Sequence, residues 1–342
     1  SYKRKRQCFW WNFICSRRNF IMPNYNGVWS LSTQYQYNTD WQADNVSPAR
    51  LAAIVAARGL FHLGEAGGSD VNTIDQINTI TEGNTTDFGD RTVTKDRTGA
   101  CASATRGVFA GGHTNVDVID FVAIATAGNA TDFGNLGAAV SRIVGNSSST
   151  RGIFAGGYTN AKINTIQYIT IGSAGNATDF GDLVSARIDM AACGSTTRGL
   201  FAGGEAGGNV DVIEYITIAN TGNTTDFGNL VGVKTRHAGA SSSTRALFGG
   251  GVRSGGTAEI DFVTIASTGN ATDFGNLSVV RYDLFSCSNS IRGIFAGGEG
   301  DSKLNVIDFV AIASTGDATD FGDLTATSLL GSGCCASHGG IA

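Results

Sequence analysis

Composition argues against a chain with membrane-spanning helices and against a disordered chain. The chain has 342 residues, 48 of them glycine and two proline, and a net charge of −5, and no apolar run reaches the roughly 18 residues that a membrane-spanning helix needs. Glycine is about twice as frequent as the average of roughly 7%, and we expect it to serve turns and close packing rather than disorder. Length alone would allow two domains, but an internal repeat argues for a single large one.

The first 21 residues form a basic, aromatic segment. They carry six basic and no acidic side chains, so the remaining chain has a net charge of −11 (−5 − 6). The segment contains Lys3, Arg4, Lys5, Arg6, Phe9, Trp10, Trp11 and Phe13, followed by Ile14, Arg17 and Arg18. A basic arm on an acidic body is typical of docking, to a protein, an anionic membrane or nucleic acid, and we expect a protein. The alternative is upstream sequence before a natural start at Met22. No secretory signal is evident, because the apolar centre is too short.

From residue 58 onward the chain repeats itself about every 47 residues. The motif RGxF begins at Arg58, Arg106, Arg151, Arg198, Arg245 (as RALF) and Arg292, in steps of 48, 45, 47, 47 and 47 residues. The motif TDFG keeps the same spacing, with its aspartate at Asp87, Asp132, Asp179, Asp226, Asp273 and Asp320. Such self-similarity at a fixed period indicates a repeat architecture.

Each repeat contains four short apolar runs separated by turn residues. In the fourth repeat these are residues 188–193 (IDMAAC), 198–204 (RGLFAGG), 212–218 (VIEYITI) and 225–230 (TDFGNL). Runs of this length, rich in β-branched and aromatic residues and bounded by Gly, Ser, Thr or Asn, are typical of strands and too short for ordinary helices. Four strands, A to D, in each repeat predict a propeller blade, since propeller repeats have periods of about 40–50 residues.

The details of the repeat are similar to those of a known family. An arginine precedes strand A, Gly-Gly closes strand B, strand C holds an acidic-aromatic pair such as Glu214-Tyr215, and strand D holds an aromatic residue. This pattern, over about residues 28–342, resembles the kelch motif, and the resemblance implies a fold only. Two departures are phenylalanine in place of the usual strand D tryptophan, and His62-Leu63-Gly64 in place of Gly-Gly in the first repeat.

Fragments at both ends of the chain predict how the ring closes. Residues 28–35 and 37–41 are similar to strands C and D, while residues 328–335 and 339–342 are similar to strand A and the start of strand B. Together they would make a composite seventh blade, and closure removes the unpaired edges that invite aggregation. We therefore predict an all-β, seven-bladed, kelch-like propeller over residues 22–342, closed by strands from both termini, with residues 1–21 as a separate arm.

The repeat explains most motifs that could indicate chemistry. Asp-Phe-Gly is also the metal-binding motif of protein kinases, but six copies without a phosphate loop or catalytic loop exclude that interpretation. We expect the Asn, Asp and Thr side chains to cap the C–D turns, with Asp317 replacing the usual asparagine, and the phenylalanines to pack between blades. The repeat also generates N-x-T sequons, so we do not expect glycosylation. They begin at Asn84, Asn129, Asn176, Asn223 and Asn270.

No catalytic, metal or cofactor site is predicted. Cys101, Cys193 and Cys287 occupy one strand A position on different blades, too far apart for disulfides, and are expected to be small core residues. The four histidines, His62, His113, His237 and His338, lie at different repeat positions and lack metal-ligand spacing. The sequence has no G-x-S-x-G or H-E-x-x-H motif, and no loop has the dense oxygen ligands of a strong calcium site.

Binding is expected on one face of the ring. Antiparallel strands place the A–B and C–D turns on one face and the B–C and D–A connections on the other. The sequences of the A–B and C–D turns hardly vary along the chain, whereas those of the B–C and D–A connections differ from repeat to repeat. Binding residues are often found on variable loops of a rigid scaffold. The alternative is that these loops vary only because they are solvated. The candidate binding residues are Tyr158, Lys162, Glu205, Arg253, Glu299, Asp301 and Lys303.

Phrases such as STGNATDFG also resemble repeats in virion and tail proteins of marine bacteriophages. This resemblance implies a non-enzymatic component of a virus particle, in the tail or associated with the capsid. We expect it to be assembled in the host cytoplasm, attached through its N-terminal arm to other virion proteins, and carried on the extracellular particle. The alternatives are an adhesin module that binds a host receptor or glycan, and a kelch-type oxidase or lyase. We expect no cofactor and neither nucleic acid nor membrane as a partner.

Overall fold

The fold is a ring of antiparallel sheets. In a computed structural model of the chain, residues 57–338 are described; they belong to the unit Leu51–Ala342. All regular elements of residues 57–338 are strands, and this part of the chain contains no helix that could cross a membrane. Its seven sheets comprise six of four strands, called blades 1 to 6 below, and one small sheet of three strands.

The strands are assigned to the sheets as follows. Blade 1 contains β27 (Ser332–Cys335), β1 (Arg58–His62), β4 (Thr73–Asn78) and β5 (Thr86–Asp90). Blade 2 contains β6 (Gly99–Ala102), β7 (Arg106–Ala110), β8 (Val116–Ala123) and β9 (Thr131–Val140). Blade 3 contains β10 (Val144–Ser147), β11 (Arg151–Ala155), β12 (Thr165–Thr170) and β13 (Thr178–Asp182). Blade 4 contains β14 (Ala191–Gly194), β15 (Arg198–Ala202), β16 (Val212–Thr217) and β17 (Thr225–Asn229). Blade 5 contains β18 (Ala238–Ser241), β19 (Arg245–Gly249), β20 (Glu259–Thr264) and β21 (Thr272–Asn276). Blade 6 contains β22 (Phe285–Ser288), β23 (Arg292–Ala296), β24 (Val306–Ala311) and β25 (Thr319–Asp323). The small sheet contains β26 (Ser328–Leu329), β2 (Glu65–Ala66) and β3 (Ser69–Asp70).

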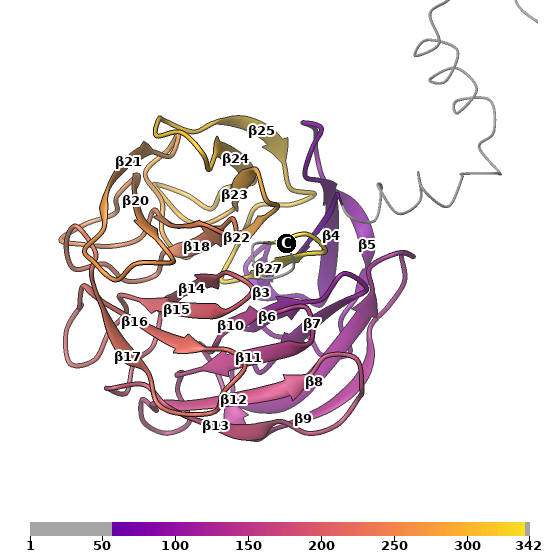
Figure 1. Cartoon of the computed structure of the whole chain (residues 1–342). Helices are drawn as coiled ribbons and strands as arrows, with labels where there is room; N and C mark the ends of the chain where they lie inside the picture. The colour runs from indigo at the N-terminus through magenta and orange to yellow at the C-terminus, as the bar shows by residue number, and fades with distance from the viewer. Residues whose placement is uncertain (1–56, 339–342) are drawn as a thin grey trace, which may run out of the picture. The chain divides into compact units, whose positions relative to one another are not determined.

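The innermost strands close the ring. The A strands β27, β6, β10, β14, β18 and β22 contact one another in a closed cycle. They surround the centre of the ring, and the D strands β5, β9, β13, β17, β21 and β25 lie at its periphery (Figure 1). The predicted all-β propeller, closed by a blade that joins distant parts of the chain, is therefore confirmed, and seven sheets are present.

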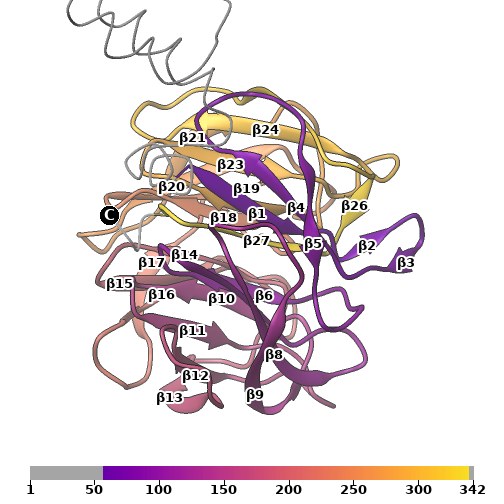
Figure 2. The ribbon, with the colours of Figure 1, turned by 90° about the vertical axis from the view of Figure 1, so that its right-hand side faces the viewer.

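The closing blade differs from the prediction in its composition. Strand β27 pairs with β1 of the first repeat, with Cys334 opposite Leu60. The reason is register: Cys334 lies 47 residues after Cys287 and occupies the same position opposite strand B, so β27 supplies the strand A of the first repeat. The strands predicted at residues 28–35, 37–41 and 339–342 lie outside the described residues. The seventh sheet is the small one, whose β2–β3 hairpin stands out from the ring (Figure 2).

Each C–D turn binds to the outer strand of the preceding blade. At the blade 4–5 junction, the Gly269 N–H donates to the Phe227 carbonyl at 2.7 Å, and the Asn270 Oδ1 accepts from the Asn229 N–H at 3.0 Å. The asparagine side chains thus connect neighbouring blades, which corrects the expectation that they cap their own turns. Asp317 makes the same bond to the Asn276 N–H at 2.9 Å. The other bonds of this kind join Asp90 to Asn129, Asn135 to Asn176, Asp182 to Asn223 and Asp323 to Asn84.

The TDFG phenylalanines pack between blades, as predicted. Phe227 of blade 4 is buried in one cluster with Phe248 and Val263 of blade 5. Its ring also meets the strand C ring of Tyr215 edge-on, at 5.9 Å between centroids. The RGxF arginine covers that aromatic residue and reaches the next blade: Arg198 lies 4.7 Å from the Tyr215 centroid and donates to the Ile265 carbonyl at 2.8 Å. Apolar, cation–π and hydrogen-bond contacts therefore coincide at each junction.

Buried ion pairs fix four of the six D–A connections. Arg187, just before β14, donates to Glu214 of β16 at 2.7 Å, and both side chains are almost fully buried. Equivalent pairs join Arg91 to Asp120, Lys234 to Asp261 and Arg281 to Asp308. Burial lowers the pKa of Arg187, an effect that the Glu214 carboxylate opposes. A charge removed from water in this way depends on its partner.

The cysteines of residues 57–338 lie in the core without disulfides, as predicted for Cys101, Cys193 and Cys287. Cys101, Cys193, Cys287, Cys334 and Cys335 are buried free thiols. A Cβ added to Gly152 of the neighbouring blade would lie 2.6 Å from the Cys101 Sγ. In blade 3 the glycine of RGxF therefore leaves room for the sulfur of the preceding blade, and burial raises the thiol pKa of Cys101. Such thiols are inert packing groups.

Replacing Phe227 with alanine is expected to lower the free energy of unfolding by about 3–5 kcal/mol, because it leaves a cavity between blades 4 and 5. Urea denaturation measures the change. Val184→Ala is the control: that side chain is 73% exposed, so its loss should cost within about 0.5 kcal/mol. Equal costs for the two variants would contradict the inter-blade packing.

Replacing Glu214 with glutamine is expected to cost about 3–5 kcal/mol, because Arg187 then becomes an uncompensated buried charge. The matched control is Glu205→Gln, which breaks the half-exposed pair between Glu205 and Lys162 and should cost less than about 1 kcal/mol. The same denaturation experiment compares them, and a Glu205 effect as large as that of Glu214 would refute this assignment.

Candidate functional site

The variable connections share one face of the ring, called the loop face. In blades 3 to 6, the D–A connection that leads into a blade pairs with the B–C hairpin of that blade. The bridges are Ser141↔Tyr158, Ile188↔Glu205, Thr235↔Val252 and Tyr282↔Glu299. The small sheet repeats this arrangement in blade 1, where Glu65 pairs with Leu329. The prediction that B–C and D–A connections lie together is therefore confirmed. The opposite face, with the A–B and C–D turns, is called the turn face.

All seven candidate binding residues belong to B–C hairpins of the loop face, but several are engaged within the ring. Lys162 of blade 3 pairs with Glu205 of blade 4 at 2.7 Å, and Lys303 of blade 6 pairs with Glu65 of blade 1. Arg253 pairs with Glu259 at 2.7 Å. These charges therefore connect and orient the hairpins before they can serve any partner.

The remaining three candidates are placed differently. Tyr158 is 39% exposed and Asp301 is exposed. Glu299 lies beside Tyr282: partial burial and the Glu299 carboxylate raise the pKa of the Tyr282 hydroxyl. Tyr158 and Asp301 thus offer free surface on this face. The predicted docking arm of Lys3, Arg4, Lys5, Arg6, Phe9, Trp10, Trp11 and Phe13 lies outside the described residues.

A ring of left-handed residues surrounds the mouth of the central channel on the loop face. Its members occupy one repeat position, just before each strand A, and have φ between 54° and 58°. Backbone N–H groups within this ring donate to carbonyls of neighbouring members at 2.8–3.0 Å. These bonds stabilise a conformation that is unfavourable for residues other than glycine. The six members are Arg97, Arg142, Asp189, Arg236, Asp283 and Leu330.

Four successive side chains of this ring, from Arg142 to Asp283, form a network of alternating charge. Arg142 pairs with Asp189, and Arg236 lies between Asp189, at 4.0 Å, and Asp283, at 3.4 Å. Burial raises the pKa of Asp283 to about 6, although Arg236 opposes this shift. Sequence reasoning missed these residues. Their spacing of 45 or 47 residues was the signal that a repeat-by-repeat alignment of charged positions would have revealed.

The channel itself is narrow. Three hollows of about 60, 120 and 90 Å³ follow one another between the inner strands, whereas small-molecule pockets usually measure about 300–1,000 Å³. His237 lines the two hollows nearer the loop face. Burial and the charges of Lys234 and Arg187 lower the pKa of His237 well below its usual value, so its imidazole is neutral. The candidate sites therefore lie on the loop face rather than inside the channel.

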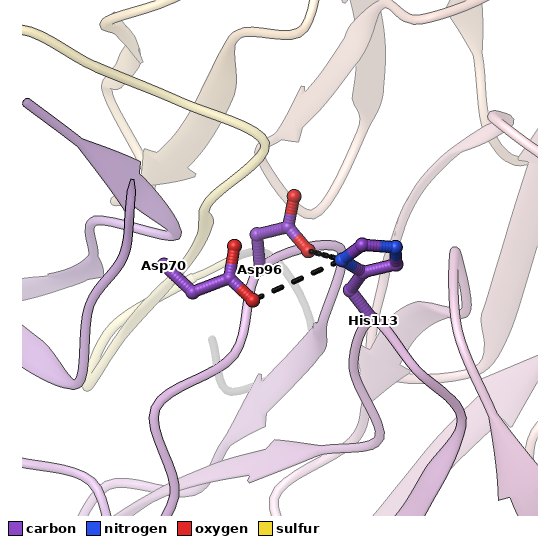
Figure 3. Close-up of side chains that lie close together, drawn as sticks. All are labelled: Asp70, Asp96 and His113. Atoms are coloured by element: carbon purple, nitrogen blue, oxygen red, sulfur yellow. Dashed lines mark ion pairs between the residues drawn. The ribbon is translucent and has the colours of Figure 1, made fainter. Parts of the chain in front are cut away.

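One group of three potential metal ligands lies on the loop face. Within residues 57–338, Asp70 of β3, Asp96 before β6 and His113 after β7 bring a ligand atom each to within 4.8 Å of one another. The His113 Nδ1 lies 3.8 Å from an Asp70 oxygen and 3.6 Å from an Asp96 oxygen. Both carboxylates point toward the imidazole (Figure 3). The sequence predicted no metal ligands, because these residues come from three separate segments at different repeat positions.

Comparison with protein-family models and with curated proteins finds no match for this chain.

Between pH 4 and pH 6, Asp283 is expected to reduce the stability of the ring as the pH rises. Its pKa of about 6 in the folded protein exceeds the value of about 3.9 in an unfolded chain. The folded state therefore binds this proton more tightly than the unfolded chain does. The resulting stabilisation of the folded state is complete below pH 4 and is lost as the pH rises through 6. The loss amounts to about 3 kcal/mol at most.

Denaturation of the wild type and of Asp283→Asn across pH 4–8 measures this effect. The stability of the wild type relative to Asp283→Asn should fall between pH 4 and 6 and level off above pH 7. Asp226→Asn, at an exposed carboxylate, is the matched control and should leave the profile unchanged. A relative stability that rises with pH would contradict the assigned shift.

Proposed function

We propose that the chain is a non-enzymatic binding propeller whose loop face contacts a partner. The observation that carries this proposal is the contrast between the two faces. The turn face repeats the same side chains and the same inter-blade bonds, from Asn84 to Asp317. The B–C hairpins of the loop face differ in charge from blade to blade, although those of blades 1, 3, 4, 5 and 6 share one pattern of backbone bridges.

The rigidity of the ring supports this proposal. Buried ion pairs fix four of the D–A connections, and charges join the B–C hairpins at two of the junctions between blades. Loops held in this way lose little conformational entropy when they bind, which favours affinity. The exposed side chains of Tyr158 and Asp301 and the charged channel mouth would supply specific contacts.

We further propose that the chain is a structural component of a virus particle, in a phage tail or associated with the capsid. Support comes from repeat sequences such as STGNATDFG, which resemble repeats in virion and tail proteins of marine bacteriophages. The opposite net charges of residues 1–21 and of the rest of the chain also support it. In this proposal the basic arm attaches the propeller to other virion proteins, and the loop face points outward. Assembly would take place in the host cytoplasm, and the finished protein would be carried on the extracellular particle.

A second candidate is an adhesin module that binds a host receptor or surface glycan. The exposed ring of Tyr158 favours it, since an aromatic ring supplies a large contact area at low entropic cost. Both candidates use the same face and differ in the partner.

Two measurements on the full chain test the proposal. Mass spectrometry and immunogold labelling of virus particles from the natural source should detect the protein, and the chain lacking residues 1–21 should no longer associate with those particles. Absence from the particles would refute the virion assignment, and equal association without the arm would refute its docking role.

The binding face is tested with matched variants. Tyr158→Ala combined with Asp301→Ala should weaken binding to host cells or to a glycan array at least tenfold. Asn220→Ala combined with Thr268→Ala, at exposed positions of the turn face, should leave binding unchanged. A tenfold loss from the turn-face variant alone would place the binding surface on the wrong side of the ring.

A further inference from the structure

Three junctions on the loop face use the same pair of repeat positions. At each of these junctions, a residue in the B–C hairpin of one blade contacts a residue of the next blade. That second residue is the one that follows Gly-Gly, or follows the sequence that replaces Gly-Gly in blade 1. Lys162 meets Glu205 between blades 3 and 4, and Lys303 meets Glu65 between blades 6 and 1. Between blades 1 and 2 the same positions hold Asp70 and His113. The third junction therefore has a carboxylate where the other two have a lysine.

The residue next to each pair also differs. At the two lysine junctions it is apolar: Ile188 bridges to Glu205, and Leu329 pairs with Glu65. At the blade 1–2 junction the equivalent residue is Asp96, whose carbonyl accepts from the His113 N–H at 2.9 Å. The backbone arrangement is the same, but a second carboxylate replaces an aliphatic side chain.

The charges at this junction are not balanced by the protein groups that face it. Arg97 lies 3.3 Å from the Asp96 Oδ2 and compensates one carboxylate. The Asp96 side chain is 2% exposed, and its Oδ1, which faces the His113 Nδ1, is buried without a hydrogen-bond partner among the described residues. Lys95 donates to the Thr114 hydroxyl instead, and Glu65 is held by Lys303. A buried acceptor without a donor is costly, and a cation would satisfy it.

We propose that Asp70, Asp96 and His113 bind a divalent transition-metal ion of the zinc or manganese type. Two carboxylate oxygens and one imidazole nitrogen are ligands that these ions accept, whereas calcium and magnesium prefer oxygen alone. The ligand atoms already converge, and a small movement of the β2–β3 hairpin would bring them to bonding distance.

The position of the site predicts what the ion does. It would connect the β2–β3 hairpin of blade 1 to blade 2, as the Lys–Glu pairs connect the other two junctions. The side chains of His113 and Asp70 are 49% and 29% exposed, so further coordination positions face solvent. These positions could accept water, or an oxygen ligand from a partner on the loop face.

Isothermal titration of the EDTA-treated full chain with MnCl₂, and separately with ZnCl₂, at pH 7.5 tests the site. The wild type should bind one equivalent more of the metal than His113→Ala or Asp96→Asn, and Asp70→Asn should weaken that binding at least tenfold. Asp226→Asn, an exposed carboxylate away from the site, should bind like the wild type. Manganese is included because residues 1–56 contain two cysteines that could bind zinc independently.

A thermal unfolding scan with and without Mn²⁺ provides a second readout. The metal should raise the unfolding temperature of the wild type and of Asp226→Asn, and leave that of His113→Ala unchanged. If Asp96→Asn does not fold, the exposed His113 and Asp70 variants decide the test. Equal stoichiometry in wild type and His113→Ala, or no binding of either ion by the wild type, would overturn the proposal.

Discussion

The structure depends on the contact between each C–D turn and the outer strand of the preceding blade. An outer strand has an unpaired edge, and such an edge favours aggregation unless something covers it. Here the backbone of the next turn pairs with that edge, as Gly269 does with Phe227, and an asparagine side chain adds a further acceptor. The contact also explains the glycine of TDFG. Gly228 has φ of +144°, and a Cβ there would lie 2.4 Å from the Gly269 carbonyl oxygen.

This constraint determines where the sequence is free to vary. Residues of the turn face must preserve the junction bonds, so they recur almost unchanged through the chain. On the loop face, backbone bridges hold each B–C hairpin against the adjoining D–A connection without using side chains, and the side chains there can therefore differ. The hydrogen bonding of the ring therefore explains why the side chains of the turn face are uniform and those of the loop face differ from blade to blade.

The sequence was sufficient to predict the strands, the two faces and the role of the phenylalanines, because each depends on local pattern and on the repeat. It was not sufficient for the partners of individual side chains. Asn270 binds Asn229 of the neighbouring blade, a contact that a turn-capping pattern does not distinguish from a local one. The pairing of β27 with β1 depended on register, which Cys334 would have indicated through its spacing from Cys287. The group of Asp70, Asp96 and His113 required the three-dimensional neighbourhood of two blades.

The loop-face junctions show how one backbone arrangement accommodates different chemistry. Two junctions hold Lys–Glu pairs, while others use amides: Asn115 donates to the Thr159 carbonyl, and Asn209 to that of Arg253 at 3.4 Å. Because the bridges between backbone segments hold each hairpin, replacing one kind of side-chain contact by another need not disturb the ring. The Asp70–His113 junction follows the same principle with an excess of negative charge. Since a surplus carboxylate destabilises a junction that packing already fixes, its presence is best explained by a ligand that the other junctions do not bind.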